Sequence, residues 1–237
     1  MNYYIIGCGG VATYFLPAFL KTLKHHKSFK KSSVYLVDGD YIENKNYSRQ
    51  VFDAGMENVN KAEALCRMYA NSNYIENLTA ITDYITESFI PEFKSMLIGF
   101  VDNHPARKDI LTVADRNKCK VLFAANSTIG AQAMYYDPDW CNTSMDPRIR
   151  YPEILTTERG SPVHAVGCNT EEKLDETPQT AIANQLAATH ALHLWNFWSI
   201  ECKKLDPAQS FNFWPIESNN TFTKFNSVLT GDLTKNE

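Results

Sequence analysis

The chain has 237 residues, of which 44% are apolar and 21% are charged, and its formal net charge at neutral pH is −4. This composition is that of an ordinary globular protein long enough to bury a substantial core. The acidic balance argues against nucleic acid as the main ligand, because proteins that bind phosphate backbones usually carry a basic face.

The apolar run at 3–6 is followed by Gly-x-Gly-Gly, which predicts a buried strand that enters a tight turn. Residues 11–23 suit a helix, and the basic stretch 24–33 is expected to be a solvated loop. A second buried strand at 34–37 ends at Asp38. The apolar N-terminal stretch is not expected to be a signal peptide or membrane anchor, because no basic residue precedes it and glycines interrupt it.

Beyond Asp38 the chain alternates between predicted helices and strands. Helices are expected at 60–70, 105–117 and 178–200, and strands at 77–81, 95–101, 121–125 and 130–136. This alternation indicates an α/β protein with a Rossmann-like fold: a mostly parallel, doubly wound sheet with helices on both faces and an extended C-terminal part.

Residues 137–177 lack clear periodicity, which predicts a long loop or crossover. We therefore expect one Rossmann-like domain over 1–205 and a polar, partly disordered tail over 206–237. The cysteines form no Cys-x-x-Cys pair, which excludes a zinc site of paired cysteines and, with the chain length, argues against a disulfide framework. Reduced thiols favour a cytoplasmic protein.

The glycine turn Gly7-Cys8-Gly9-Gly10-Val11-Ala12 fits the pattern G-x-G-x-x-A between a strand and a helix. Glycines there let backbone N–H groups approach a phosphate, and the helix N-terminus adds the positive end of its dipole. Asp38 ends the next strand, where a ribose-binding carboxylate belongs. This pattern alone fits an NAD-dependent oxidoreductase as well as an ATP-binding enzyme, or a turn that only packs tightly.

The polar segment that follows Asp38 favours ATP over a dinucleotide. Arg49 and Lys61 have no evident use in hydride transfer, whereas both can neutralise a triphosphate. Asp102 ends another predicted strand and should lie at the same edge of the sheet. A carboxylate there can hold Mg²⁺, which prefers oxygen ligands and phosphate.

Four motifs carry a resemblance to a known family: GCGG at 7–10, VDGDYIENKNYSRQVF at 37–52, KA at 61–62 and VDNHPAR at 101–107. In their order and spacing they resemble the ThiF/MoeB-type superfamily of adenylating enzymes, which is related to the ubiquitin-activating enzymes. The resemblance lies within the first 125 residues. It implies ATP-dependent adenylation of the C-terminal carboxylate of a ubiquitin-like protein or peptide, release of pyrophosphate, and a homodimer.

The resemblance also implies roles for single residues. Gly7, Gly9 and Gly10 would contact the nucleotide phosphates, Asp38 would hold the ribose hydroxyls, and Asp102 would bind Mg²⁺ near the α-phosphate. Other polar residues are expected to contact the bound ATP: Asp40, Asn46, Arg49, Gln50 and Lys61. Of these, Arg49 and Lys61 are expected to act in catalysis together with Asp102.

The chain departs from the family pattern in ways that matter for turnover. Relatives usually carry an N-terminal segment whose arginine reaches the ATP site of a neighbouring subunit, whereas here the first strand is expected almost at Met1. Either Arg107 or Arg49 of a neighbouring copy substitutes, or the protein is a nucleotide-binding adaptor with impaired turnover. Cys168, in the 137–177 loop, resembles the thioester-forming cysteine of activating enzymes, and Cys141 is a less favoured candidate.

Overall fold

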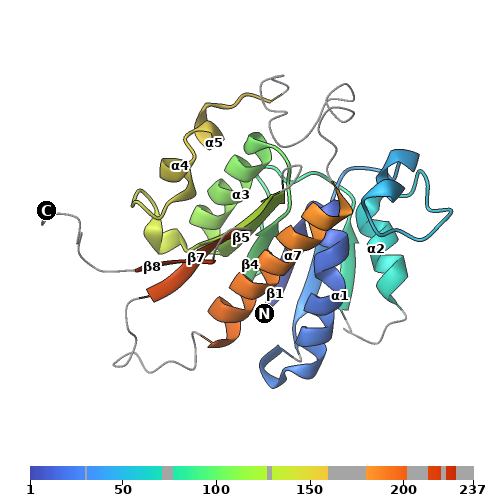
Figure 1. Ribbon diagram of the computed structural model, residues 1–237, viewed down its shortest axis with the longest axis horizontal. Helices are drawn as coiled ribbons and strands as arrows, with labels where there is room; N and C mark the ends of the chain where they lie inside the picture. The colour runs from blue at the N-terminus through green and yellow to red at the C-terminus, as the bar shows by residue number, and fades with distance from the viewer. Residues whose placement is uncertain are drawn as a thin grey trace, which may run out of the picture.

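The structure is a computed structural model that describes residues 1–29, 31–70, 77–126, 130–159, 180–201, 213–219 and 223–227. Within them one sheet has the strand order β3-β2-β1-β4-β5-β6-β7-β8 (Figure 1). The strands are β1 (Asn2–Ile6), β2 (Ser33–Val37), β3 (Asn77–Ile81), β4 (Ser95–Gly99), β5 (Lys120–Asn126), β6 (Ala131–Tyr136), β7 (Phe213–Asn219) and β8 (Thr223–Ser227). Pairing is parallel from β3 to β5 and antiparallel from β5 to β8. The predicted Rossmann-like, mostly parallel sheet is therefore confirmed.

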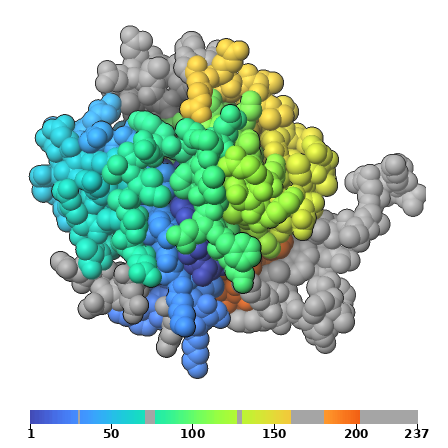
Figure 2. Space-filling view, turned by 180° about the vertical axis from the view of Figure 1, so that it is seen from behind, coloured from blue at the N-terminus to red at the C-terminus, as the bar shows by residue number. Residues whose placement is uncertain are grey.

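Helices cover both faces of this sheet, as expected for a doubly wound fold. The longer ones are α1 (Gly10–His25), α2 (Lys61–Ala70), α3 (His104–Asn117) and α7 (Ala181–Asn196), the last continuing into the π-helical turn η5 (Phe197–Glu201). Apolar side chains of α1, α2 and α7 pack on one face, and those of α3 pack on the other. Figure 2, seen from behind, shows the green and yellow segments from α3 onward spread over that second face.

Aromatic packing joins α7 to the first strand and helix. The ring of Trp195 lies 4.8 Å from that of Phe19 and 6.2 Å from that of Tyr3, both in edge-to-face geometry. All three side chains are almost completely buried. Such pairs add to the free energy gained by burying apolar surface. The late helix, far away in sequence, is therefore part of the core beneath the glycine turn.

The register of the parallel strands brings the predicted site residues to one edge. Ile6 pairs with Val37 on one side and with Gly99 on the other, so β1, β2 and β4 end level with one another. The residues that follow these strands therefore meet at their common carboxyl edge, where open α/β sheets bind ligands.

Several segments differ from what the sequence predicts. Residues 24–33 are not simply a solvated loop: α1 runs to His25, and the 3₁₀ turn η1 (Lys27–Phe29) buries Phe29 against Trp195. The expected 137–177 loop contains the turn η3 (Pro138–Trp140) and the short helices α4 (Pro147–Arg150) and α5 (Glu153–Thr156). The expected tail contributes β7 and β8 to the sheet. No helix in the described part of the chain is long and apolar enough to span a membrane.

Candidate functional site

A cavity of about 350 Å³ lies at the carboxyl edge of the parallel strands. Its walls come from the segments that follow β1, β2 and β4 and from the last residue of β5, with α5 and the start of α7 at the same end of the molecule (Figure 1). Ten residues predicted from the sequence line it: Gly7, Gly9, Gly10, Asp38, Asp40, Asn46, Arg49, Gln50, Lys61 and Asp102. The structure thus brings the scattered motifs together in one place.

The three glycines of the turn differ in what a side chain at each position would meet. Gly7 has a φ of +88°, and an added Cβ would lie 2.8 Å from the carbonyl oxygen of Phe100. At Gly10 an added Cβ would overlap the side-chain amide of Asn184 on α7. At Gly9 it would meet nothing closer than Gln50 Nε2 at 3.7 Å. The backbone thus requires glycine at position 7, a side chain at position 10 would displace Asn184, and Gly9 leaves open space at the N-terminus of α1.

Asp38 joins the end of β2 to the glycine turn. Its Oδ2 accepts the backbone N–H of Cys8 at 2.6 Å, and its Oδ1 accepts that of Asp40 at 2.8 Å. The residue is only 9% exposed, and burial raises the pKa of its carboxyl group although these bonds and nearby Lys61 oppose the rise. Each oxygen keeps a lone pair, so the carboxylate can still accept hydroxyl groups of a sugar.

Asp40 and Lys61 form a pair at the cavity wall. Lys61 Nζ lies 3.0 Å from Asp40 Oδ2, and the Tyr84 hydroxyl donates to the other carboxylate oxygen. Burial alone would raise the pKa of Asp40, but Tyr84 and Lys61 together hold it below its usual value. The Tyr84 ring fits because Gly39 has no side chain: a Cβ there would lie 2.6 Å from the ring. The ammonium group of Lys61 is therefore fixed in place.

The 3₁₀ turn η2 (Asn44–Ser48) places the next group of predicted residues. The buried Asn46 side chain accepts the backbone N–H of Glu43 at 2.9 Å and so caps the turn. The backbone carbonyl of Arg49 accepts a 2.9 Å bond from Asn184 Nδ2. Gln50 Oε1 is buried without a hydrogen-bond partner among the described residues. Asn46 therefore shapes the loop, while Arg49 and Gln50 offer their side chains to the cavity.

Asp102 follows β4 and is exposed to the cavity. One of its oxygens accepts a 3.1 Å bond from Asn103, whose own side chain caps α3 through the backbone N–H of Ala106. Within the described ranges no three His, Cys, Asp or Glu residues are grouped to hold a metal ion. Mg²⁺ usually takes only one or two carboxylates together with substrate phosphates. Asp102 therefore fits Mg²⁺ that arrives with a nucleotide.

Four polar lining residues lie outside the motifs and were missed by reading the sequence: Tyr84, Asn126, Arg159 and Asn184. Arg107, suggested in a neighbouring copy as a substitute cation, donates to the backbone carbonyl of Val101 at 3.2 Å in its own chain and is not among the residues that line that chain's cavity. Arg159 lines the cavity instead and pairs with Asp109 of α3. No motif marks these four: Tyr84 and Arg159 lie in segments without a clear pattern, and the patterns that predict the helix around Asn184 and the strand before Asn126 do not indicate a site.

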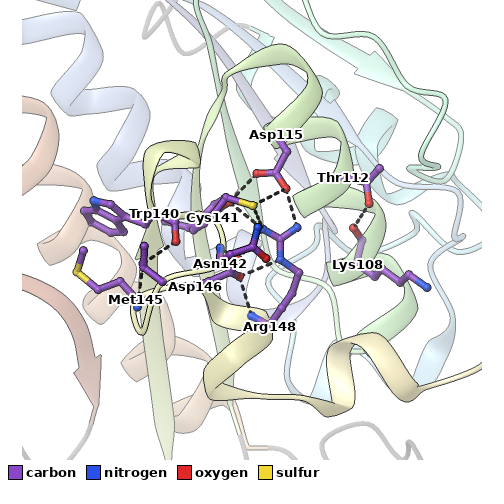
Figure 3. Close-up of polar contacts among 11 residues, drawn as sticks. Lys108, Thr112, Asp115, Trp140, Cys141, Asn142, Met145, Asp146 and Arg148 are labelled. Atoms are coloured by element: carbon purple, nitrogen blue, oxygen red, sulfur yellow. Dashed lines mark hydrogen bonds and ion pairs between the residues drawn. The ribbon is translucent and has the colours of Figure 1, made fainter.

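The candidate thiols are not in this cavity as far as the structure describes them. Cys168 lies outside the described residues. Cys141 lies in a polar cluster with Asp115, Asp146 and Arg148 (Figure 3), where Arg148 donates to its sulfur at 3.4 Å. Cys8 is fully buried, and burial raises its pKa well above the usual value, as expected for a packing residue.

Comparison of the sequence with family models and with curated proteins finds no match. Comparison with solved structures finds E. coli MccB bound to ATP (TM-score 0.60, 19% identity, 95% of this chain and 62% of that chain). MccB with AMPCPP and MccA gives a TM-score of 0.61 at 20% identity, again covering 95% of this chain and 62% of that chain. PaaA gives a TM-score of 0.51 at 16% identity, covering 79% of this chain and 52% of PaaA. The chain thus spans 62% of the length of these MccB chains. The chain therefore has the fold of MccB, the Microcin C7 biosynthetic enzyme, which agrees with the Rossmann-like fold predicted from its motifs.

Proposed function

We propose that this protein activates a carboxylate with ATP, forming an acyl-adenylate and pyrophosphate. The observation that carries the proposal is the convergence of four kinds of group on one cavity. These are an open glycine position at a helix N-terminus, a buried carboxylate at the end of β2, the cations Arg49 and Lys61, and the carboxylate of Asp102. Each matches one part of Mg-ATP.

The nucleotide would lie along the ends of β2 and β1. The carboxylate of Asp38 would accept the ribose hydroxyls, and the backbone N–H groups after Gly9 would donate to the phosphates. Arg49 and Lys61 would neutralise the triphosphate, with Lys61 held in place by Asp40. Positioning and charge stabilisation suffice for this reaction, so no protein nucleophile is needed for adenylation.

Asp102 is the residue that would hold Mg²⁺ beside the phosphates. Bound there, the ion would neutralise negative charge that builds up on the phosphates as pyrophosphate leaves. The exposed Asp102 carboxylate has an oxygen that its bond from Asn103 leaves free, which suits one inner ligand of an octahedral ion.

The proposed second substrate is the C-terminal carboxylate of a peptide or ubiquitin-like protein. Support comes from the shared fold with MccB, which has been crystallised with MccA and, as the Microcin C7 biosynthetic enzyme, with N-formylated MccA. A homodimer and a thioester on Cys168 are further parts of the proposal that rest on the family resemblance.

The direct test is carboxylate-dependent exchange of labelled pyrophosphate into ATP in the presence of Mg²⁺. The full chain should catalyse exchange with a panel of short peptides and ubiquitin-like proteins, and Asp102→Ala should abolish it. If Mg-ATP binds without exchange across the panel, and Asp102→Ala changes nothing, the chain is a nucleotide-binding adaptor and not an adenylating enzyme.

Thermal unfolding separates ATP from a nicotinamide dinucleotide. A ligand at a hundredfold excess over its Kd stabilises the folded state by about 2.7 kcal/mol. Mg-ATP should raise the melting temperature accordingly, whereas stabilisation by NAD and not by Mg-ATP would instead support an oxidoreductase.

A further inference from the structure

The residues that line the cavity form two groups, one toward the β2 side of the sheet and one toward the β5 side. The residues proposed to bind ATP come from the glycine turn, the end of β2 and η2. Asn126 and Arg159 line the cavity from β5 and from the segment after α5. Since the strand order is β2-β1-β4-β5, Asn126 is separated from Asp38 by two strands. This side is left for a second ligand.

Asn126 is the last residue of β5, and its side-chain amide has a donor without a partner among the described residues. The Nδ2 atom is buried and has no hydrogen-bond partner among the described residues. Leaving such a group unpaired costs about 1–3 kcal/mol, so buried amides normally find an acceptor. A ligand with an oxygen acceptor in the cavity would satisfy it.

Arg159 supplies a positive charge on the same side. Its guanidinium pairs with the carboxylate of Asp109, whose side chain is only 11% exposed, while that of Arg159 is 64% exposed. A guanidinium carries five N–H donors in a fixed fork, more than the one carboxylate of Asp109 can accept. Asp109 therefore holds Arg159 at the cavity wall and leaves donors for an anion.

We propose that Asn126 and Arg159 form the subsite that binds the carboxylate of the second substrate, next to the Asp102 end of the cavity. This inference rests on the proposed function. An amide N–H and a guanidinium match the two oxygens of a carboxylate, and the cation reduces the repulsion between that anion and the triphosphate. One carboxylate oxygen then attacks the α-phosphorus, forming a new P–O bond, while the bond to the β-phosphate breaks and pyrophosphate leaves with its electron pair.

Two ligands that differ only in an acyl group test this subsite: sulfamoyladenosine and glycyl-sulfamoyladenosine. Both fill the nucleotide site, but only the second places a carbonyl oxygen where the substrate carboxylate would lie. In calorimetric titrations the full-length protein should bind the glycyl compound more tightly. Asn126→Ala and Arg159→Gln should each weaken glycyl-sulfamoyladenosine about tenfold or more, while affinity for sulfamoyladenosine and Mg-ATP stays within about twofold.

A charge-sensitive variant distinguishes a binding role from a structural one. Asn126→Asp keeps the shape of the side chain but replaces the donor by a second anion, so exchange should show a higher KM for the carboxylate substrate than Asn126→Ala. Arg159→Lys should recover part of the loss seen in Arg159→Gln. Matched controls away from the cavity are Asn77→Ala at the start of β3 and Arg67→Ala, which pairs with Glu63 on α2; neither should change any affinity.

The outcomes separate the two proposals. If the wild-type chain binds neither Mg-ATP nor the adenosine compounds, the proposed function itself fails. If it binds them but the Asn126 and Arg159 variants keep full preference for the glycyl compound, the subsite alone is wrong. Equal losses for ATP and for the glycyl compound would place both residues in the nucleotide site and would equally overturn the inference.

Discussion

Replacing Gly9 by alanine should separate ligand binding from folding. The added methyl group would have Gln50 Nε2 as its nearest neighbour at 3.7 Å, and the φ of −85° lies outside the left-handed region that favours glycine. The free energy of unfolding should therefore fall by no more than about 1 kcal/mol, the usual cost of alanine at a helix N-cap. The methyl group would occupy the space that a phosphate needs, so Mg-ATP should bind at least about tenfold more weakly, or about 1.4 kcal/mol.

The matched comparison is the neighbouring glycine at position 7. Gly7→Ala combines a positive φ with a contact of 2.8 Å to the Phe100 carbonyl oxygen. We expect it to lower the free energy of unfolding by about 2–4 kcal/mol, from left-handed strain and overpacking together. Urea unfolding and calorimetric titration with Mg-ATP measure both quantities. Unchanged ATP affinity in a well-folded Gly9→Ala protein would refute the placement of phosphate at this turn.

Three more variants test other parts of the structure. Arg148→Ala leaves Asp146, 1% exposed, without its ion-pair partner and should lower the free energy of unfolding by about 3–5 kcal/mol in urea, whereas the surface variant Arg67→Ala should be nearly neutral. Tyr84 and Lys61 lower the pKa of Asp40 in the folded protein despite the opposing effect of burial. The ionised Asp40 carboxylate therefore contributes its full stabilisation above the pKa of the unfolded chain, near 3.8, and this stabilisation is lost as the pH falls through the lower pKa of the folded protein. In the Asp40→Asn variant the free energy of unfolding should therefore depend less on pH below about 4. If urea unfolding shows the same pH dependence in the variant and the wild type below about 4, this prediction is wrong. Asp102→Asn should keep ATP binding without metal but lose the gain in affinity that Mg²⁺ brings; a full Mg²⁺ effect in that variant would remove Asp102 as the ligand.

Much of the fold follows from the sequence because the parallel strands are short apolar runs between clear turn and helix signals. The residues after such strands necessarily meet at one edge, so Asp38 and Asp102 could be placed in a common site without coordinates. The glycine turn is local, and its role follows from the chemistry of the backbone. These features can be recognised from short stretches of sequence, although Phe100 and Asn184 lie against the turn in the structure.

What was missed depends on contacts between distant segments. Asn184 reaches Arg49 across 135 positions of sequence, and nothing in the pattern of α7 marks one asparagine for that bond. Phe29 is buried by Trp195 although its neighbours in sequence are basic, so the composition of 24–33 does not indicate its burial. Strand β7 contains Pro215, which argues against a central strand; Pro215 lies outside the paired part of β6 and β7, at a register shift against β8.

The bond from Asn184 to Arg49 has a consequence for how the protein is made. All the motifs predicted to bind a nucleotide are synthesised within the first 107 residues, yet the helix that packs beside Gly10 and buries Trp195 under Tyr3 comes some 75 residues later. A nascent chain that carries every motif residue still has an open glycine turn and an uncovered sheet face. The cavity is completed only when α7 leaves the ribosome and docks, so any ligand of this cavity needs α7 as well as the N-terminal half of the chain.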